Sequence, residues 1–342
     1  MKYIKGFDGL RAISISFVIL SHLGVFSLLP ESDFFKNRLW LLFSGETGVL
    51  VFFNLSGFLI SLILIREKIN TGSIKIKTFF IKRFLRLLPP FLIFSVSILA
   101  LKFIGLLNFS TEGFLMAFFY CYNYAPTKFY HDELVHTWSL AVEEQFYLIW
   151  PLIINYLNIK RISICIMIFI SLSVIFLFSL RYEYFIFFRR PDRWFIPSAS
   201  AILVGATIAI AIHYEKLFLT NFFKSKYALV YGIVIYLYPL FCLKYFLFLS
   251  PIIMSFGISS IIGWIYYHQN SKITNLLNLK PIRYIGKISY GIYVYQGLFL
   301  KNGPGSDLFI QQFPQNFILT MLTAIISYEF IEKQFLKLKR KY

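Results

Sequence analysis

Long apolar stretches separated by short polar connections dominate the chain. Windows of roughly 17 to 25 mostly apolar residues are long enough to cross a bilayer as helices. Such windows occur at 10–29, 48–65, 87–107, 137–157, 162–180, 195–212, 228–243, 246–267, 284–300 and 316–336. The pattern predicts an all-α, polytopic integral membrane protein with about ten transmembrane helices.

A shorter apolar run, GFLMAFFYCYNY at 113–124, is too short to span the bilayer, and we interpret it as a re-entrant or interfacial segment. With the N-terminus inside, the predicted cytoplasmic segments carry 21 of the 34 Lys and Arg residues. An eleventh span would reverse every later loop and remove this asymmetry, which is the signature of the positive-inside rule. Both termini are therefore predicted to be cytoplasmic.

The composition agrees with a single membrane domain over residues 1–342 and no appended soluble domain. The chain is 58% hydrophobic and only 15% charged, and neither an internal repeat nor a low-complexity linker divides it. Its net charge of +18 is explained by basic cytoplasmic loops, so no nucleic-acid partner is expected. Three unpaired cysteines stand in or beside apolar runs and predict no metal site.

Ionisable residues in the first predicted span suggest a function, because charges within a bilayer are costly and usually face a cavity or a partner. Arg11 and His22 are eleven residues apart. At 100° per residue they share one helix face, about 16 Å apart along the axis. A lone intramembrane histidine on the same face as an arginine is poorly explained by packing.

The second and fourth predicted spans carry further polar groups at a depth comparable to that of His22. These are Ser56 and Gly57 in the second span and Glu143 and Glu144 in the fourth. They predict a polar cavity in the outer half of the bilayer. Two alternatives stay open: the Ser-Gly pair could serve helix packing, and at least one adjacent glutamate should point elsewhere and be structural.

The predicted cytoplasmic loop at 66–90 is strongly basic. Arg83 and Arg86 lie one helical turn apart, just before Pro89 and Pro90, and could present two guanidinium groups to one phosphorylated ligand. The same loop could be only a topology signal that contacts lipid headgroups. The arginines at 181–193 could likewise contact an anionic glycan or lipid headgroups. His131, His136, His213 and His268 are expected to face water or headgroups.

Several ordered motifs resemble the acyltransferase 3 family of integral-membrane acyltransferases. GFDGLRAISISFVILSH resembles the opening signature, with Arg11 and His22 at the family's spacing, and FFIKRFLRLLPP is similar to the arginine pair, matched by Arg83 and Arg86. GVLVFFNLSGFLIS resembles the second-span motif, HTWSLAVEEQFYLIWP the tryptophan-glutamate motif with Trp138, and KISYGIYVYQGLF the late motif. The chain departs from the family at Val51, Asn54 and Gln296, where Gln296 replaces a frequent histidine.

The resemblance implies a multi-pass enzyme of the bacterial cytoplasmic (inner) membrane. It would transfer an acyl group, usually acetyl, from cytoplasmic acetyl-CoA or another acyl-CoA to a hydroxyl of an extracytoplasmic glycan or lipid-linked glycan. No bound cofactor and no metal are implied. We favour a surface polysaccharide such as lipopolysaccharide O-antigen or exopolysaccharide as acceptor, with peptidoglycan and small glycosides as alternatives.

Combined with the residue pattern, the resemblance implies a role for each candidate. His22 would act as general base or as transient acyl carrier, oriented by Glu143 or Glu144. Arg83, Arg86 and Arg11 would bind the donor phosphates, and Ser56, Gly57 and Trp138 would line the cavity or stabilise the oxyanion.

Two rival functions stay open. A proton-coupled transporter or lipid-linked glycan flippase also uses intramembrane His, Arg and Glu, although no inverted repeat is evident. A non-catalytic subunit of a polysaccharide assembly would dispense with His22 and the arginine pair. The sequence has no GxSxG, HExxH or GxxxxGK[ST] motif, which disfavours serine hydrolases, zinc proteases and P-loop ATPases.

Overall fold

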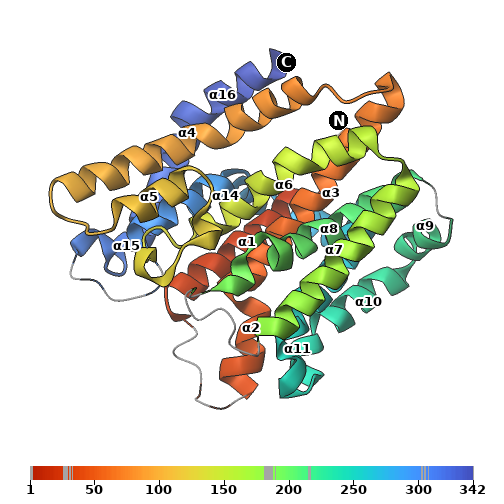
Figure 1. The fold of residues 1–342 in the computed structure, drawn as a ribbon, viewed down its shortest axis with the longest axis horizontal. Helices are drawn as coiled ribbons and strands as arrows, with labels where there is room; N and C mark the ends of the chain where they lie inside the picture. The colour runs from red at the N-terminus through yellow and green to blue at the C-terminus, as the bar shows by residue number, and fades with distance from the viewer. Residues whose placement is uncertain are drawn as a thin grey trace.

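The computed structural model of the chain describes residues 3–25, 30, 32, 34–180, 188, 190–214, 217–301, 303, 306 and 308–341. Within these residues every regular element is helical, which confirms the all-α prediction (Figure 1). The longer helices are α1 (Phe7–His22), α3 (Gly45–Thr71), α4 (Ile76–Phe103), α6 (Thr137–Tyr156), α7 (Ile159–Ser179), α8 (Phe195–His213), α10 (Lys226–Tyr236), α12 (Ser250–Tyr267), α14 (Lys280–Phe299) and α15 (Gln315–Ser327).

Short helices connect or flank the long ones. They are α2 (Trp40–Phe43), α5 (Thr111–Phe118), α9 (Leu217–Lys224), α11 (Tyr238–Phe241), α13 (Lys272–Leu277) and α16 (Lys333–Leu338). Single turns of 3₁₀ or π helix include η3 (Tyr122–Tyr124), η6 (Pro191–Arg193), η9 (Tyr328–Glu332) and η10 (Lys339–Lys341).

Among the described residues, five helical segments are long and apolar enough to cross a membrane. They are Gly45–Thr71, Ile76–Phe103, Ile159–Ser179, Pro191–His213 and Lys244–Tyr267. They coincide with the predicted spans at 48–65, 87–107, 162–180, 195–212 and 246–267. A multi-pass membrane protein is therefore supported, whereas the total of ten spans and the cytoplasmic position of both termini stay predictions.

Local backbone geometry explains why some predicted spans are shorter than expected. The predicted span at 228–243 is divided, because α10 ends at Tyr236 and α11 carries Pro239 in its first turn. With 11 residues, α10 is only about 16 Å long. α1 ends at His22, and Gly24 then turns the chain with φ 71; residues 26–29 of the first predicted span lie outside the described residues.

The basic segment before the third predicted span is helical rather than a loop. α4 begins at Ile76 and continues through Pro89 and Pro90 to Phe103. Arg83 and Arg86 therefore stand on a regular helix, which fixes their relative direction. The apolar run at 113–124 does not form a spanning helix: α5 ends at Phe118, and the chain turns at Tyr120 with a positive φ of 56.

Small residues allow the central helices to pack with their backbones in contact. α1 packs against α3 and α14, and α3 packs against α8. A Cβ atom at Gly57 of α3 would lie 1.8 Å from the carbonyl oxygen of Ile202 in α8, and one at Gly205 of α8 would lie 2.1 Å from the carbonyl oxygen of Asn54. Gly57 thus serves helix packing, which was the alternative to its placement in the cavity.

We predict that Gly57→Val prevents the close approach of α3 and α8. Because no flexible side chain can move to relieve a clash with the Ile202 backbone, the cost should be about 3 kcal/mol or more. The apparent melting temperature of the protein in detergent, followed by size-exclusion chromatography, should fall sharply.

Gly72→Val provides a control that replaces a glycine at the end of α3 by the same side chain, where nothing lies within 4 Å of the new Cβ. Its φ of +77 carries a strain cost but no clash. Equal melting temperatures for the two variants would contradict the role assigned to Gly57.

Candidate functional site

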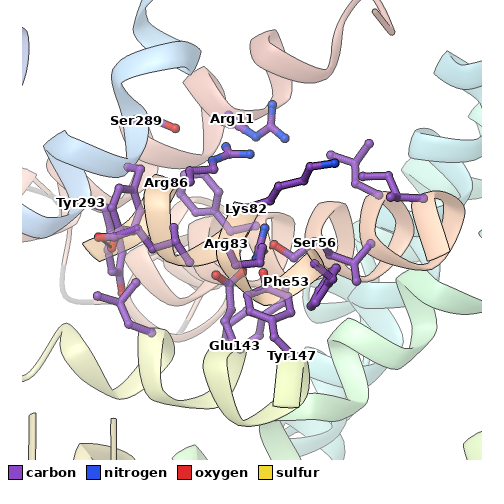
Figure 2. Close-up of a pocket in the computed structure, with 18 of the residues that line it drawn as sticks. Arg11, Phe53, Ser56, Lys82, Arg83, Arg86, Glu143, Tyr147, Ser289 and Tyr293 are labelled. Carbon is purple, nitrogen blue, oxygen red and sulfur yellow. Dashed lines mark hydrogen bonds between the residues drawn. The ribbon is translucent and has the colours of Figure 1, made fainter. Parts of the chain in front are cut away.

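A cavity of about 240 Å³ lies between α1, α3, α4, α6 and α14 (Figure 2). We call it the basic cavity. Its polar lining residues are Arg11, Ser56, Glu67, Thr78, Lys82, Arg83, Arg86, Ser139, Glu143, Tyr147, Ser289, Tyr290, Tyr293 and Lys339. The structure thus brings together five of the residues predicted from the sequence, from four different helices: Arg11, Ser56, Arg83, Arg86 and Glu143.

Three cationic side chains reach the basic cavity from α4. Lys82, Arg83 and Arg86 are spaced so that one helix face presents all of them. The Arg83 guanidinium lies over the ring of Tyr147, 3.6 Å from its centroid. Within the part of the chain that the structure describes, none of the three cations has an acidic partner.

Arg11 differs from the α4 cations because it is neutralised within its own helix. Its Nη1 lies 2.7 Å from Oδ1 of Asp8, one turn earlier in α1. The excess positive charge of the basic cavity therefore comes from α4, and an anionic ligand would complete it.

Glu143 and Ser56 form the polar contact between α6 and α3. The Ser56 hydroxyl donates a hydrogen bond to Glu143 Oε1 over 2.6 Å. Figure 2 shows Glu143 and Tyr147 projecting from α6 toward Arg83 and Ser56. Since Ser56 donates its proton to the carboxylate, that proton is not available to an oxyanion, which is a departure from the predicted role of Ser56.

Glu144 points away from the basic cavity. It is half-buried, is not part of the lining, and makes no hydrogen bond or ion pair among the described side chains. A separation of one residue on a helix turns a side chain by 100°, and of the two adjacent glutamates only one is in the lining. That one is Glu143.

His22 stands at the end of α1 and does not line the basic cavity. Its Nδ1 hydrogen-bonds to the main-chain carbonyl of Lys301. A carbonyl oxygen can only accept, so Nδ1 carries the proton and Nε2 of the neutral ring keeps a free lone pair. No contact of His22 with Glu143 or Glu144 is found among the described residues, since the Lys301 carbonyl holds the ring and Glu143 accepts from Ser56.

The late motif ends two residues before Lys301 and helps to place its carbonyl. The main-chain oxygen of Gln296, near the end of α14, accepts hydrogen bonds from the amides of Leu300 at 2.7 Å and Lys301 at 3.1 Å. The chain then turns with φ 44 at Lys301. Gln296 is fully buried, and its backbone contributes to placing the group that orients His22.

His136 is buried, which corrects the expectation that it faces water or headgroups. Its side chain is 3% exposed and lies edge-on to Phe94 and Tyr293, with ring centroids 5.1 and 5.8 Å away. The rings that cover it belong to α4 and α14, which are far from His136 in the chain. Sequence alone gives no signal for this long-range cover.

Trp138 belongs to a second cavity, of about 440 Å³, and not to the basic cavity. We call it the apolar cavity, because α3, α7, α8 and α12 line it mostly with aliphatic and aromatic side chains. Arg193 stacks over the Trp138 ring at 4.9 Å from its centroid. Among the residues that the structure describes, the two cavities share only Val49 and Phe53 of α3.

An ion-pair cluster occupies the edge of the apolar cavity. Glu46 Oε1 lies 2.5 Å from Arg190 and 3.1 Å from Arg193, and Arg190 also pairs with Asp192 at 2.7 Å. Burial alone would lower the pKa of Arg190, but its hydrogen bond to Asp192 and the charge of Glu46 raise it. These two arginines are thus paired internally; Arg181 and Arg189 lie outside the described residues.

Some lining residues were not predicted from the sequence. Lys82 could have been found from its position one residue before Arg83, and Tyr147 from its position one turn after Glu143. Lys339 gave no signal, because it follows the last apolar window and resembles an ordinary basic tail.

Comparison of the sequence with known protein families gives one match that covers most of the chain. The family described as an acyltransferase domain, acyltransferase 3, matches residues 4–329. This chain belongs to the acyltransferase 3 family. The match confirms the resemblance based on the Arg11–His22, arginine-pair and tryptophan-glutamate motifs.

Acyltransferase 3 relatives cover nearly all of this chain. The peptidoglycan O-acetyltransferase OatA of Listeria monocytogenes is 29% identical over 86% of the chain and 49% of its own length. The O-acetyltransferase OatA of Staphylococcus aureus is 28% identical over 97% of the chain and 57% of its own length. The chain spans about half the length of these relatives, and no solved structure matches it.

We predict that Arg193→Met destabilises the acyltransferase 3 domain while conserving side-chain volume. The change removes the ion pair with Glu46, the hydrogen bond to the Tyr130 hydroxyl and the stack on Trp138. Loss of charged hydrogen bonds from a buried site should lower the free energy of unfolding by about 2 kcal/mol. The apparent melting temperature should fall, whereas Lys128→Met, at an exposed cation, should leave it unchanged.

Proposed function

We propose that this protein is an O-acetyltransferase of the bacterial cytoplasmic membrane that transfers acetyl from cytoplasmic acetyl-CoA to a sugar hydroxyl of an extracytoplasmic glycan. Membership of the acyltransferase 3 family and the O-acetyltransferase names of its relatives support the reaction class. The observation that supports acetyl-CoA as the donor is the set of α4 cations that line the basic cavity and have no acidic partner among the described residues.

The donor is assigned to the basic cavity because coenzyme A carries several phosphate groups. Arg83 and Arg86 offer planar guanidinium groups that match phosphate oxygens in charge and geometry. Arg11 would contribute less, since Asp8 already neutralises it. Tyr147 holds Arg83 by stacking on its guanidinium, which leaves the N–H groups at the edge available for a ligand.

The catalytic base is assigned to His22 through its Nε2 atom. As the sugar hydroxyl attacks the thioester carbonyl, Nε2 would take the hydroxyl proton and later return it to the departing coenzyme A thiolate. The Lys301 carbonyl favours this tautomer and would stabilise the imidazolium that forms, by accepting from Nδ1–H. Arg11 and His22 stand on the same helix, so α1 connects the basic cavity, where the donor phosphates would bind, to the imidazole that would take the proton.

Ser56 and Glu143 are assigned a supporting role. Their 2.6 Å hydrogen bond fixes the carboxylate beside the α4 cations. Glu143 would thereby limit the repulsion among Arg83, Arg86 and Lys82 before the donor arrives.

The acceptor is assigned by class as a bacterial cell-envelope glycan. The Listeria relative is named for peptidoglycan, which makes peptidoglycan an acceptor to test beside lipopolysaccharide O-antigen and exopolysaccharide. A transporter or flippase would move its substrate without consuming acyl-CoA, and a non-catalytic subunit would not need His22.

We predict that His22→Ala lowers acetyl transfer by about 100-fold or more, the usual scale for loss of a general base. Glycan would be isolated from cells expressing wild type or variant and analysed by mass spectrometry before and after mild alkali. A base-labile mass gain of one acetyl group should appear only with wild type.

His268→Ala is the matched control, because His268 lies at the end of α12 and stacks on Trp264 away from both cavities. It should acetylate normally at equal protein level. Full transfer by a folded His22→Ala protein would overturn the assignment of the base, and acceptor transport without acyl-CoA turnover would favour the rival function.

A further inference from the structure

The segment after the matched family region returns to the basic cavity. The family match ends at residue 329, whereas η9, α16 and η10 continue to Lys341. α16 and η10 pack along α4, and Figure 1 shows α16 lying beside that helix. This contact brings Lys339 into the lining of the basic cavity.

Lys339 adds a positive charge where positive charge is already in excess. Lys82, Arg83 and Arg86 line the same cavity, and in the described structure neither they nor Lys339 have an acidic partner. The two acidic residues of the lining form no ion pair with these cations: Glu67 accepts from the Lys75 amide at 2.9 Å, and Glu143 accepts from Ser56.

Like charges held around one small cavity repel each other and oppose folding of the ligand-free protein. Burial, and then the charges of Arg86, Arg83, Lys82 and Arg11, lower the pKa of the Lys339 ammonium to about 7. An anion placed among these groups would reverse this effect. The arrangement is therefore suited to a ligand with several negative charges.

We propose that Lys339, from the segment beyond the family region, is a donor-binding residue that contacts a phosphate at the nucleotide end of coenzyme A. The proposal rests on the proposed function, because it takes coenzyme A as the donor. Lys339 of η10 and Arg11 of α1 are far apart in the sequence, so the donor site would be built from two distant segments with α4 between them.

The phosphate could also come from the headgroup of an anionic lipid. We commit to coenzyme A because the cations surround a cavity bounded by five helices and the C-terminal segment, instead of spreading over an outer surface. The experiment must nevertheless separate the two sources of phosphate.

The test is the affinity for coenzyme A, measured by isothermal titration calorimetry on purified full-length protein in phosphatidylcholine nanodiscs. Lys339→Gln should weaken binding about tenfold, the scale of one charge-assisted hydrogen bond. Lys339→Arg should retain most of the affinity because it keeps the charge. Lys337→Gln, at an exposed lysine of α16, should bind as wild type does.

Two further readouts separate ligand contact from a structural role. Without coenzyme A, Lys339→Gln should not lower the melting temperature, because it removes a repelled charge. Raising the pH from 7 to 9 should weaken coenzyme A binding by wild type more than by Lys339→Gln, since only wild type loses the Lys339 proton. The other charged groups facing Lys339 across the cavity, Arg11, Lys82, Arg83, Arg86, Glu67 and Glu143, are common to both proteins.

Equal coenzyme A affinity of wild type and Lys339→Gln would overturn this inference and leave the proposed function standing. An effect of Lys339→Gln that appears only in nanodiscs containing phosphatidylglycerol would overturn it in favour of a lipid headgroup. Failure of wild type to bind coenzyme A would overturn the donor assignment and this inference together.

Discussion

Backbone contact between α3 and α8 is the constraint on which the site depends. Gly57 and Gly205 let the two helices approach until main-chain atoms touch, and the Ser259 hydroxyl of α12 adds a 2.6 Å hydrogen bond to Asn54 nearby. With Gly57 directed at α8, Ser56 is turned by one helical step toward α6. One rotational orientation of α3 therefore places Gly57 against α8 and Ser56 against Glu143.

Charge is distributed along the helices in a way that separates binding from proton transfer. Three of the unpaired cations of the basic cavity stand on α4, its two carboxylates come from α3 and α6, and the oriented imidazole stands at the opposite end of α1 from Arg11. Near the apolar cavity the charged side chains pair with one another, and these are Glu46, Arg190, Asp192 and Arg193. The described arginines at the edge of the apolar cavity are thus paired, whereas the cations of α4 that line the basic cavity are not.

Hydrophobic periodicity predicted the helical class and the segments that contain the five long apolar helices, because both are local properties of the sequence. It failed at α10 and α11, where Pro239 interrupts an apolar run. Charge spacing predicted Arg83, Arg86 and one inward-facing glutamate, since each follows from helical geometry. It could not predict that Ser56 binds Glu143, that a backbone carbonyl holds His22, or that His136 is enclosed, because these contacts join segments far apart in the chain.

The residues shared by the two cavities bear on how the protein could conduct protons across the bilayer. Of the described part of the chain, Val49 and Phe53 alone line both, and their side chains offer no hydrogen bonds to water. A continuous file of water molecules would conduct protons and discharge the gradient across the bilayer. The aromatic ring and the branched aliphatic group shared by both linings offer such a file no hydrogen-bonding step at this position.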